Sequence, residues 1–151
     1  MSAEESFLTL KNFFETRAAA KQALSVIDES AEIGIVIGDT VECALIQREG
    51  HPIVERRAAA KPDIIFKIKP ESVVVLNDRT KDEIGDIGVN IMKEILAGNI
   101  SVRIPGNLFN LLRRGYVEMI KEGGAPVAAF LARHGMGQVA KIVSTIKQMK
   151  G

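Results

Sequence analysis

The feature that most constrains the fold is a series of short β-branched runs in the first half of the chain. Four such runs lie between residues 33 and 68 of the 151-residue sequence, and turn formers such as Gly38-Asp39 separate them. This spacing predicts a meander of antiparallel strands. A later run alternates apolar and polar residues before Pro105-Gly106, which predicts one last strand. The strands are expected at 33–37, 41–46, 53–55, 64–68 and 100–104.

Helical spacing of apolar residues dominates both ends of the chain. Ser2 and Glu5 form a capping-box pattern before an apolar repeat, which predicts an opening helix over about 3–27. Beyond the last strand, glycines divide the chain into three amphipathic or apolar stretches. These predict helices at about 107–122, 125–134 and 137–149.

Two further helices are expected between the fourth strand and the last. Pro70 favours a short helix start, although Val73-Val74-Val75 prefers a strand on propensity. Thr80 with Glu83 is a second capping box, and the apolar stripe that follows predicts a helix ending at Ala97-Gly98. The pattern indicates one α+β domain with helices gathered on one side of a sheet. Its parts are an N-terminal helix at 1–29, the sheet and central helices at 30–106, and a C-terminal helical cap at 107–151.

The segment from Ala125 to Ala132 is apolar on nearly every side, so it must be covered all round. It could be a central core helix, a contact in a homodimer, or one wall of an apolar cavity shared with the sheet. Periodicity alone leaves these three alternatives open.

The net charge of +1 conceals a gradient along the chain. Residues 1–50 have a net charge of −5, residues 51–99 a net charge of 0, and residues 100–151, with eight basic and two acidic side chains, a net charge of +6. A basic third can face phosphate, nucleic acid or anionic lipid. Nucleic acid is disfavoured, because the chain has no Trp and one Tyr to stack on bases.

Few side chains could support catalysis or bind a metal. Cys43 is the single cysteine and lies in a β-branched run, which is typical of a buried apolar residue. His51 lies in a turn-forming segment and His134 at a helix end, and neither has a ligand partner at metal spacing. We therefore expect no enzyme, no metal and no cofactor. The acidic N-terminus, the lone cysteine and the lack of an 18-residue apolar stretch predict a cytoplasmic protein.

Three segments resemble the sterol-carrier-protein-2 lipid-transfer domain. They are Pro62-Asp63-Ile64-Ile65-Phe66-Lys67-Ile68-Lys69-Pro70-Glu71, the helix end Ile95-Leu96-Ala97-Gly98, and Ile100-Ser101-Val102-Arg103-Ile104-Pro105-Gly106. The likeness covers about residues 30–125 and consists of loose apolar and small-residue patterns. This chain departs from the family in its longer helical tail and in lacking a peroxisomal C-terminal tripeptide.

The resemblance implies a five-stranded, mostly antiparallel sheet with helices on one face, enclosing an apolar tunnel for a fatty acyl-coenzyme A, a fatty acid or a sterol. It implies carriage without catalysis, a small-molecule partner, transient membrane contact and a monomer or homodimer. The residues expected to contact the lipid tail are Phe66, Ile91, Phe109, Leu112, Phe130, Leu131, Val139 and Ile142.

An anionic head group requires cations at the mouth of the tunnel. One guanidinium group can donate two hydrogen bonds to two oxygens of a phosphate, so the arginines of the basic third are candidates for binding the head group. The residues expected to bind the head group are Arg103, Arg113, Arg114, Arg133 and Lys141. Two alternatives remain: a homodimeric assembly module that uses the apolar C-terminal helices, and an enzyme acting on a bound thioester with His51 or His134 as base.

Overall fold

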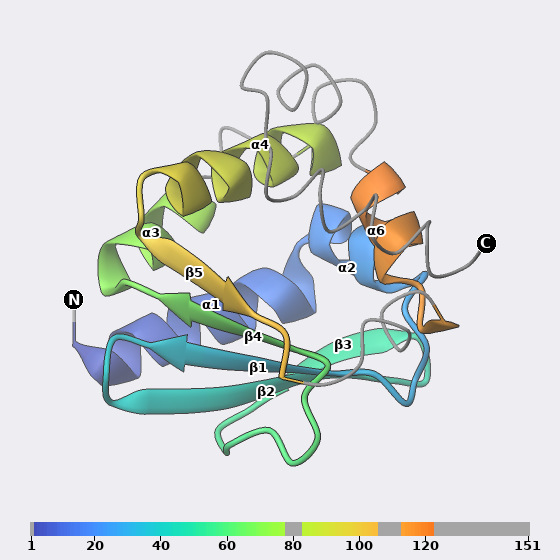
Figure 1. Ribbon diagram of the computed structural model, residues 1–151, viewed down its shortest axis with the longest axis horizontal. Helices are drawn as coiled ribbons and strands as arrows, with labels where there is room; N and C mark the ends of the chain where they lie inside the picture. Colours follow the sequence, from blue (N-terminus) through green and yellow to red (C-terminus); the bar gives the residue numbers. More distant parts are fainter. Residues whose placement is uncertain (1, 78–82, 106–112, 123–151) are drawn as a thin grey trace.

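The computed structural model describes residues 2–77, 83–105 and 113–122. One five-stranded sheet forms the base of the molecule, and the helices lie together on one side of it (Figure 1). This arrangement confirms the predicted α+β fold. The helices are α1 (Ala3–Thr16), α2 (Ala18–Leu24), α3 (Pro70–Leu76), α4 (Ile84–Leu96) and α6 (Tyr116–Glu122). The strands are β1 (Glu32–Ile37), β2 (Val41–Arg48), β3 (His51–Glu55), β4 (Ile64–Ile68) and β5 (Ile100–Arg103).

The strands follow the order β3-β2-β1-β4-β5 across the sheet. β1, β2 and β3 form the antiparallel meander that the sequence predicts. β4, however, pairs with β1 in parallel, so the predicted meander is wrong at its fourth strand. β5 then pairs antiparallel with β4. All strand pairs of the sheet except β1 with β4 are therefore antiparallel.

The outer edge of β3 is occupied by α1, which explains why the fourth strand lies elsewhere. The Lys11 Nζ atom donates to the carbonyl oxygen of Val54 at 3.0 Å. The N–H of Val54 donates to the Glu15 carboxylate at 2.9 Å. These side chains, one helical turn apart, take the backbone groups that a neighbouring strand would use.

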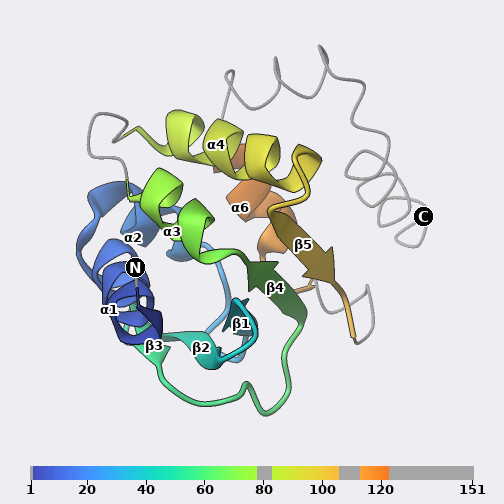
Figure 2. The same ribbon diagram turned by 90° about the vertical axis from the view of Figure 1, so that its left-hand side faces the viewer.

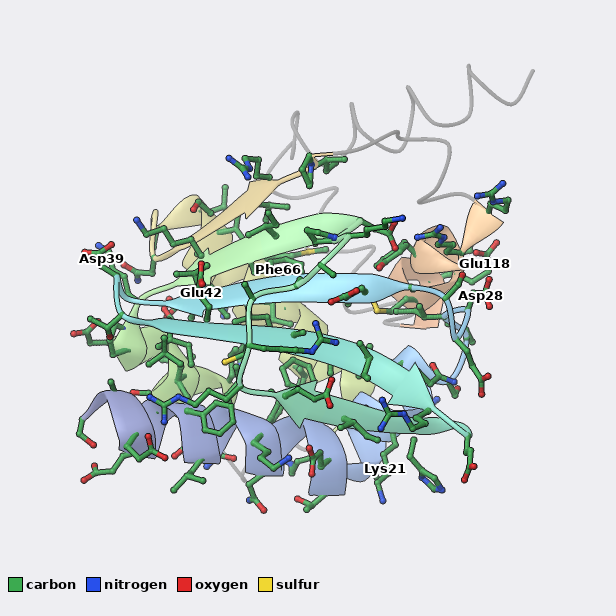
Figure 3. All side chains as sticks on the ribbon, turned by 90° about the horizontal axis from the view of Figure 1, so that it is seen from below. Lys21, Asp28, Asp39, Glu42, Phe66 and Glu118 are labelled. Carbon is green, nitrogen blue, oxygen red and sulfur yellow. The ribbon has the colours of Figure 1, made fainter. Side chains whose placement is uncertain are left out.

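The connection from β3 to β4 therefore crosses the outer face of the sheet, as Figure 3 shows. Gly34 in β1 lies beneath this connection, because a Cβ atom there would be 3.5 Å from the Ala59 Cβ and 3.6 Å from the Pro62 Cβ. Arg57 holds the start of the connection by donating to the Glu32 carboxylate at 2.8 Å. The chain then enters β4 beside β1.

The predicted opening helix over 3–27 is interrupted in the structure. Arg17 has extended backbone angles, φ −76° and ψ 127°, and separates α1 from α2. Its guanidinium carbon lies 5.3 Å from the centre of the Phe13 ring, so the break buries its side chain against α1. The turn lets α2 bury Ala19 and Leu24. Apolar spacing continues across the break, which is why the pattern does not reveal it.

The other helices agree in part with the sequence. α3 begins at Pro70, as predicted, but α4 begins at Ile84 with Glu83 as its N-cap instead of Thr80. A continuous helix over 107–122 is wrong, because Gly115 has a φ of +91° and α6 starts after it. The helices predicted at 125–134 and 137–149 lie outside the described residues. Within the described ranges, none of the helices has the length and hydropathy needed to cross a membrane.

Candidate functional site

The inner face of the sheet, on which the helices pack, is sealed in one half and partly open in the other. In β1 and β2 the inward side chains are almost fully buried, with Ile35 2% exposed and Cys43 1% exposed. In β4 and β5, Phe66 is half-buried and Val102 is 40% exposed. These four side chains share one face, because Ile35 pairs with both Cys43 and Phe66 and Phe66 pairs with Val102.

We call the partly covered region the half-open apolar face. Its members come from β4, from β5 and the residues after it, and from α4 and α6. All of them are partly exposed, and all except Val102 pack against the main hydrophobic core. They are Ile64, Phe66, Ile95, Val102, Ile104 and Met119. The opposite end of the same two strands is closed, since Ile68 and Ile100 are 4% and 2% exposed and share the core with Val73 of α3. An apolar surface that is open only at one end suits a ligand or a partner.

Three of the arginines predicted for a head group lie near the open end of β4. Arg103 pairs in register with Ile65 at the end of β5, and strand alternation directs its side chain to the outer face. Arg114 forms an ion pair with Asp63, the residue just before β4. Arg113 precedes Arg114 and is exposed. Positive charge therefore lies at the same end of the sheet as the half-open apolar face, with Arg103 on the opposite side of β5. Arg133 and Lys141 lie outside the described residues.

Asp63 is buried, with 5% of its surface exposed, and both of its carboxylate oxygens are bound. Arg114 Nη1 donates to Oδ1 at 2.6 Å, and the Tyr116 hydroxyl donates to Oδ2 at 3.1 Å. The backbone N–H of Asp63 also donates to the Glu32 carbonyl at 2.9 Å. The start of β1, the start of β4 and the start of α6 thus meet at one paired buried charge.

The pKa values of both partners of Asp63, Arg114 and Tyr116, are raised. The hydrogen bond to Asp63 raises the pKa of Arg114 above its usual value. Burial, with the Asp63 carboxylate alongside, raises the pKa of the Tyr116 phenol far above its usual range. The guanidinium therefore stays charged and the phenol stays protonated as a donor. The sequence analysis includes Asp63 in the segment from Pro62 to Glu71 without giving it a partner, so it does not predict this partnership.

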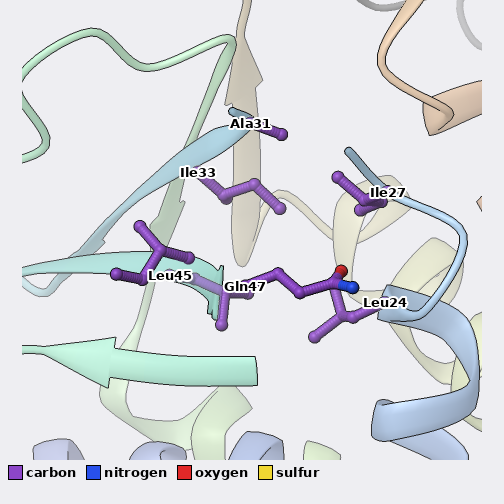
Figure 4. Close-up of a pocket in the computed structure, with 7 residues that line it drawn as sticks. Leu24, Ile27, Ala31, Ile33, Leu45 and Gln47 are labelled. Carbon is purple, nitrogen blue, oxygen red and sulfur yellow. The ribbon is translucent and has the colours of Figure 1, made fainter. Parts of the chain in front are cut away.

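A small pocket lies one strand away from the half-open apolar face (Figure 4). In register, its lining residue Ile33 pairs with Ile64 of that face. Its volume of about 10 Å³ suits about one water molecule. Gln47 extends toward Leu24, the last residue of α2. With its amide oxygen and nitrogen exchanged, the Gln47 amide would donate to the carbonyls of Leu24 and Ile27. The lining residues are Leu24, Ile27, Ala31, Ile33, Leu45, Ile46 and Gln47. The larger tunnel that the resemblance implies stays a prediction.

The predicted tail-binding residues are only partly within the described chain. Phe66 borders the main core, whereas Ile91 of α4 packs on a smaller cluster that contains Phe13 and Ile87. The structure therefore places these two residues against different parts of the core. The other predicted tail residues lie outside the described residues: Phe109, Leu112, Phe130, Leu131, Val139 and Ile142.

The reactive side chains within the described ranges are separated from one another. Cys43 lies on the sealed inner face, where burial raises the pKa of its thiol to about 11. His51 is exposed at the first position of β3. In the same ranges, no three His, Cys, Asp or Glu side chains are grouped so that they could hold a metal ion. The homodimer alternative involves residues 125–132, which lie beyond these ranges. The thioester alternative involves His134, which also lies beyond them, or the exposed His51.

Comparison with known proteins found structural similarity only. No protein-family model and no curated protein matches the sequence. A structure titled "UbiJ-SCP2 Ubiquinone synthesis protein" aligns with 80% of this chain and 88% of its own, at 16% identity and a TM-score of 0.45. The sterol carrier protein domain 2 of Helicoverpa armigera aligns with 80% of this chain and 87% of its own, at 20% identity and a TM-score of 0.45. Apo sterol carrier protein 2 from Yarrowia lipolytica aligns with 79% of this chain and 89% of its own, at 13% identity and a TM-score of 0.40.

Proposed function

We propose that the protein binds and carries an amphiphile in the cytoplasm, a fatty acyl-coenzyme A or a fatty acid, with a sterol as the alternative ligand. The observation that carries this proposal is the half-open apolar face at the β5 edge of the sheet. Arg103 is exposed on the outer side of the same edge strand, and Arg113 is exposed next to Arg114. The tail would lie against Phe66 and Val102, and the anionic head would reach the arginines. No bond is made or broken, so the activity is carriage and not catalysis.

Burial of the tail accounts for the affinity in this proposal. Each buried methylene contributes about 0.8 kcal/mol, so about ten methylenes contribute about 8 kcal/mol. Loss of translational and rotational freedom on association offsets about half of that or more. The remaining free energy suits a carrier that must also release its ligand.

The head group then supplies selectivity among apolar compounds. Coenzyme A carries several phosphate charges, and a guanidinium can bind two phosphate oxygens at once. Arg103 and Arg113 are the proposed contacts. Arg114 already binds Asp63 and keeps 20% of its side chain exposed, so only its remaining N–H groups would face a head group.

The ligand itself is the first test. Native mass spectrometry of the purified full-length protein, with denaturing extraction of whatever is bound, should reveal a fatty acid, an acyl-coenzyme A or a sterol. Palmitoyl-coenzyme A should also raise the melting temperature, because a ligand that binds only the folded state stabilises it. An empty protein whose melting temperature does not respond to palmitoyl-coenzyme A, palmitic acid or cholesterol contradicts the proposal.

A matched pair of arginine variants separates head-group binding from general charge. Arg103→Gln removes a charge at the end of β5, next to Val102 of the half-open apolar face, and Arg48→Gln removes one at the end of β2, which β1 and β4 separate from β5. We expect Arg103→Gln to weaken palmitoyl-coenzyme A binding about tenfold, in line with a charged hydrogen bond of about 1.4 kcal/mol. Arg48→Gln should leave binding unchanged. Equal effects from the two variants would exclude a specific role for Arg103.

A further inference from the structure

We propose that Asp63, Arg114 and Tyr116 form a latch that positions α6 beside the half-open apolar face and so sets how fast a ligand enters and leaves. This inference rests on the proposed function and adds a mechanism for access to the same site. It concerns positioning, since the three side chains bind one another through Asp63.

The latch is held from two sides. On the β4 side, the Asp63 carboxylate accepts hydrogen bonds from Arg114 Nη1 at 2.6 Å and from the Tyr116 hydroxyl at 3.1 Å. From the segment after α2, the N–H of Asp28 donates to the Arg114 carbonyl at 2.9 Å. Between these contacts Gly115 lies so close to Val26 that a Cβ atom would collide with the Val26 carbonyl oxygen. Residues 114–116 are therefore clamped between β4 and the segment that leads into β1.

The clamp fixes the start of α6, and α6 borders the half-open apolar face. Tyr116 is the first residue of α6, 3% exposed, and its hydroxyl ties the helix directly to the sheet. One turn further along, Met119 contributes to the half-open apolar face. α6 also packs against α2 and α4, the latter of which contributes Ile95 to the same face. Movement of α6 away from the sheet would therefore widen access to Phe66.

The Tyr116 hydroxyl is the part of the latch that can be removed most cleanly. The ring is packed in the main core, and Phe would keep that packing while losing the bond to Asp63. The ion pair of Asp63 with Arg114 would remain. Because one buried hydrogen bond contributes about 1 kcal/mol, the population with α6 displaced should rise about fivefold.

The experiment measures ligand kinetics in the full-length Tyr116→Phe protein. Stopped-flow fluorescence with NBD-labelled stearic acid gives the association and dissociation rate constants well below the melting temperature. We expect both constants to rise about fivefold while Kd changes by less than about twofold. Amide hydrogen exchange in α6 should accelerate by a similar factor, and exchange in α1 should not change.

Arg57→Gln serves as the matched control, because it breaks exposed ion pairs with Glu32 and Glu55 on the outer side of the sheet. It should leave both rate constants as in the wild type. If Tyr116→Phe binds the probe with wild-type rate constants, the latch has a structural role only and the inference is wrong. If the wild type itself does not bind the probe, the proposed function fails, and the role of the latch in ligand access fails with it.

Discussion

The two halves of the inner sheet face have similar side chains and different burial. Ile35 in β1 and Phe66 in β4 are partners in register, yet the first is 2% exposed and the second is only half-buried. α1 and α2 lie over the β1–β2–β3 half, as Figure 2 shows, and α1 also binds the backbone of Val54 at its edge. The comparison indicates that the first half supplies stability, whereas the second half keeps the exposed apolar surface on which we propose that a ligand binds.

The largest expected effect is at Gly115, between the residue that precedes β4 and the segment that leads into β1. Ala at this position would place its Cβ against the Val26 carbonyl and would require a φ of +91°, which L residues rarely adopt. We expect Gly115→Ala to lower the free energy of unfolding by about 4 kcal/mol in urea denaturation. Gly98→Ala is the control, because Gly98 has a φ of +80° but a Cβ atom there would have no neighbour within 4 Å, so it should lose about 1 kcal/mol. Equal losses would mean that the close contact at Val26 does not exist.

The register pair Ile35 and Phe66 tests the comparison itself. Ile35→Ala should lower the free energy of unfolding by about 3 kcal/mol, because it leaves a cavity in a sealed core. Phe66→Ala should cost about 2 kcal/mol although it removes more atoms, since its site is already partly open. Fatty-acid binding should show the reverse order, with Phe66→Ala the more damaging variant. A larger loss of unfolding free energy for Phe66→Ala than for Ile35→Ala would contradict the conclusion that the β1–β2–β3 half is the one that stabilises the fold.

The sealed half should also be sensitive to alkaline pH through Cys43. Burial raises the pKa of this thiol from 9.0 to about 11, so the neutral thiol is favoured in the folded protein. Its contribution to stability is fully present below pH 9, the unfolded value, and is lost as pH rises through 11, by about 2 kcal/mol. The difference in unfolding free energy between the wild type and Cys43→Ala should follow this curve. A difference that stays constant up to pH 11 would show that the thiol is not buried.

The smallest effect on stability is expected at Val102, in the open half. Val102→Ser should change the free energy of unfolding by about 0.5 kcal/mol, because the side chain is already 40% exposed. Binding of NBD-labelled stearic acid should nevertheless weaken about threefold as apolar contact area is lost. Val74→Ser on α3, where Val74 is 54% exposed, should have a similar stability effect and no binding effect. If both variants bind equally well, Val102 is not part of the ligand site.

Local sequence patterns are sufficient to predict most elements of this fold. Alternation and turn formers locate all five strands to within a few residues, because strand character depends on neighbours in the sequence. The parallel partner of β4 cannot be found in this way. Its position depends on Lys11 and Glu15 occupying the β3 edge, a contact across about forty residues that no local pattern encodes.

The candidate site is less predictable from the sequence than the fold. Residue type and position in the sequence are enough to propose Phe66 and Arg103 as ligand contacts. The structure places Phe66 in β4 and Arg103 at the end of β5. The role of Asp63 cannot be predicted from residue type, because its side chain is buried against Arg114 and Tyr116, which follow it by 51 and 53 residues. The charge of Arg114 alone suggests a ligand contact, and a buried partner for it becomes visible only in three dimensions.

The central claim is that the tail of an amphiphile lies on the half-open apolar face. The most direct test is an NMR measurement of nuclear Overhauser effects between bound dodecanoic acid and protein methyl groups labelled at Ile, Val and Met. The account predicts contacts from the acyl chain to Ile64, Ile95, Val102 and Met119, and none to Ile35 in the sealed half. Contacts confined to the sealed half, or a lack of saturable binding by dodecanoic acid and by longer chains, would contradict it.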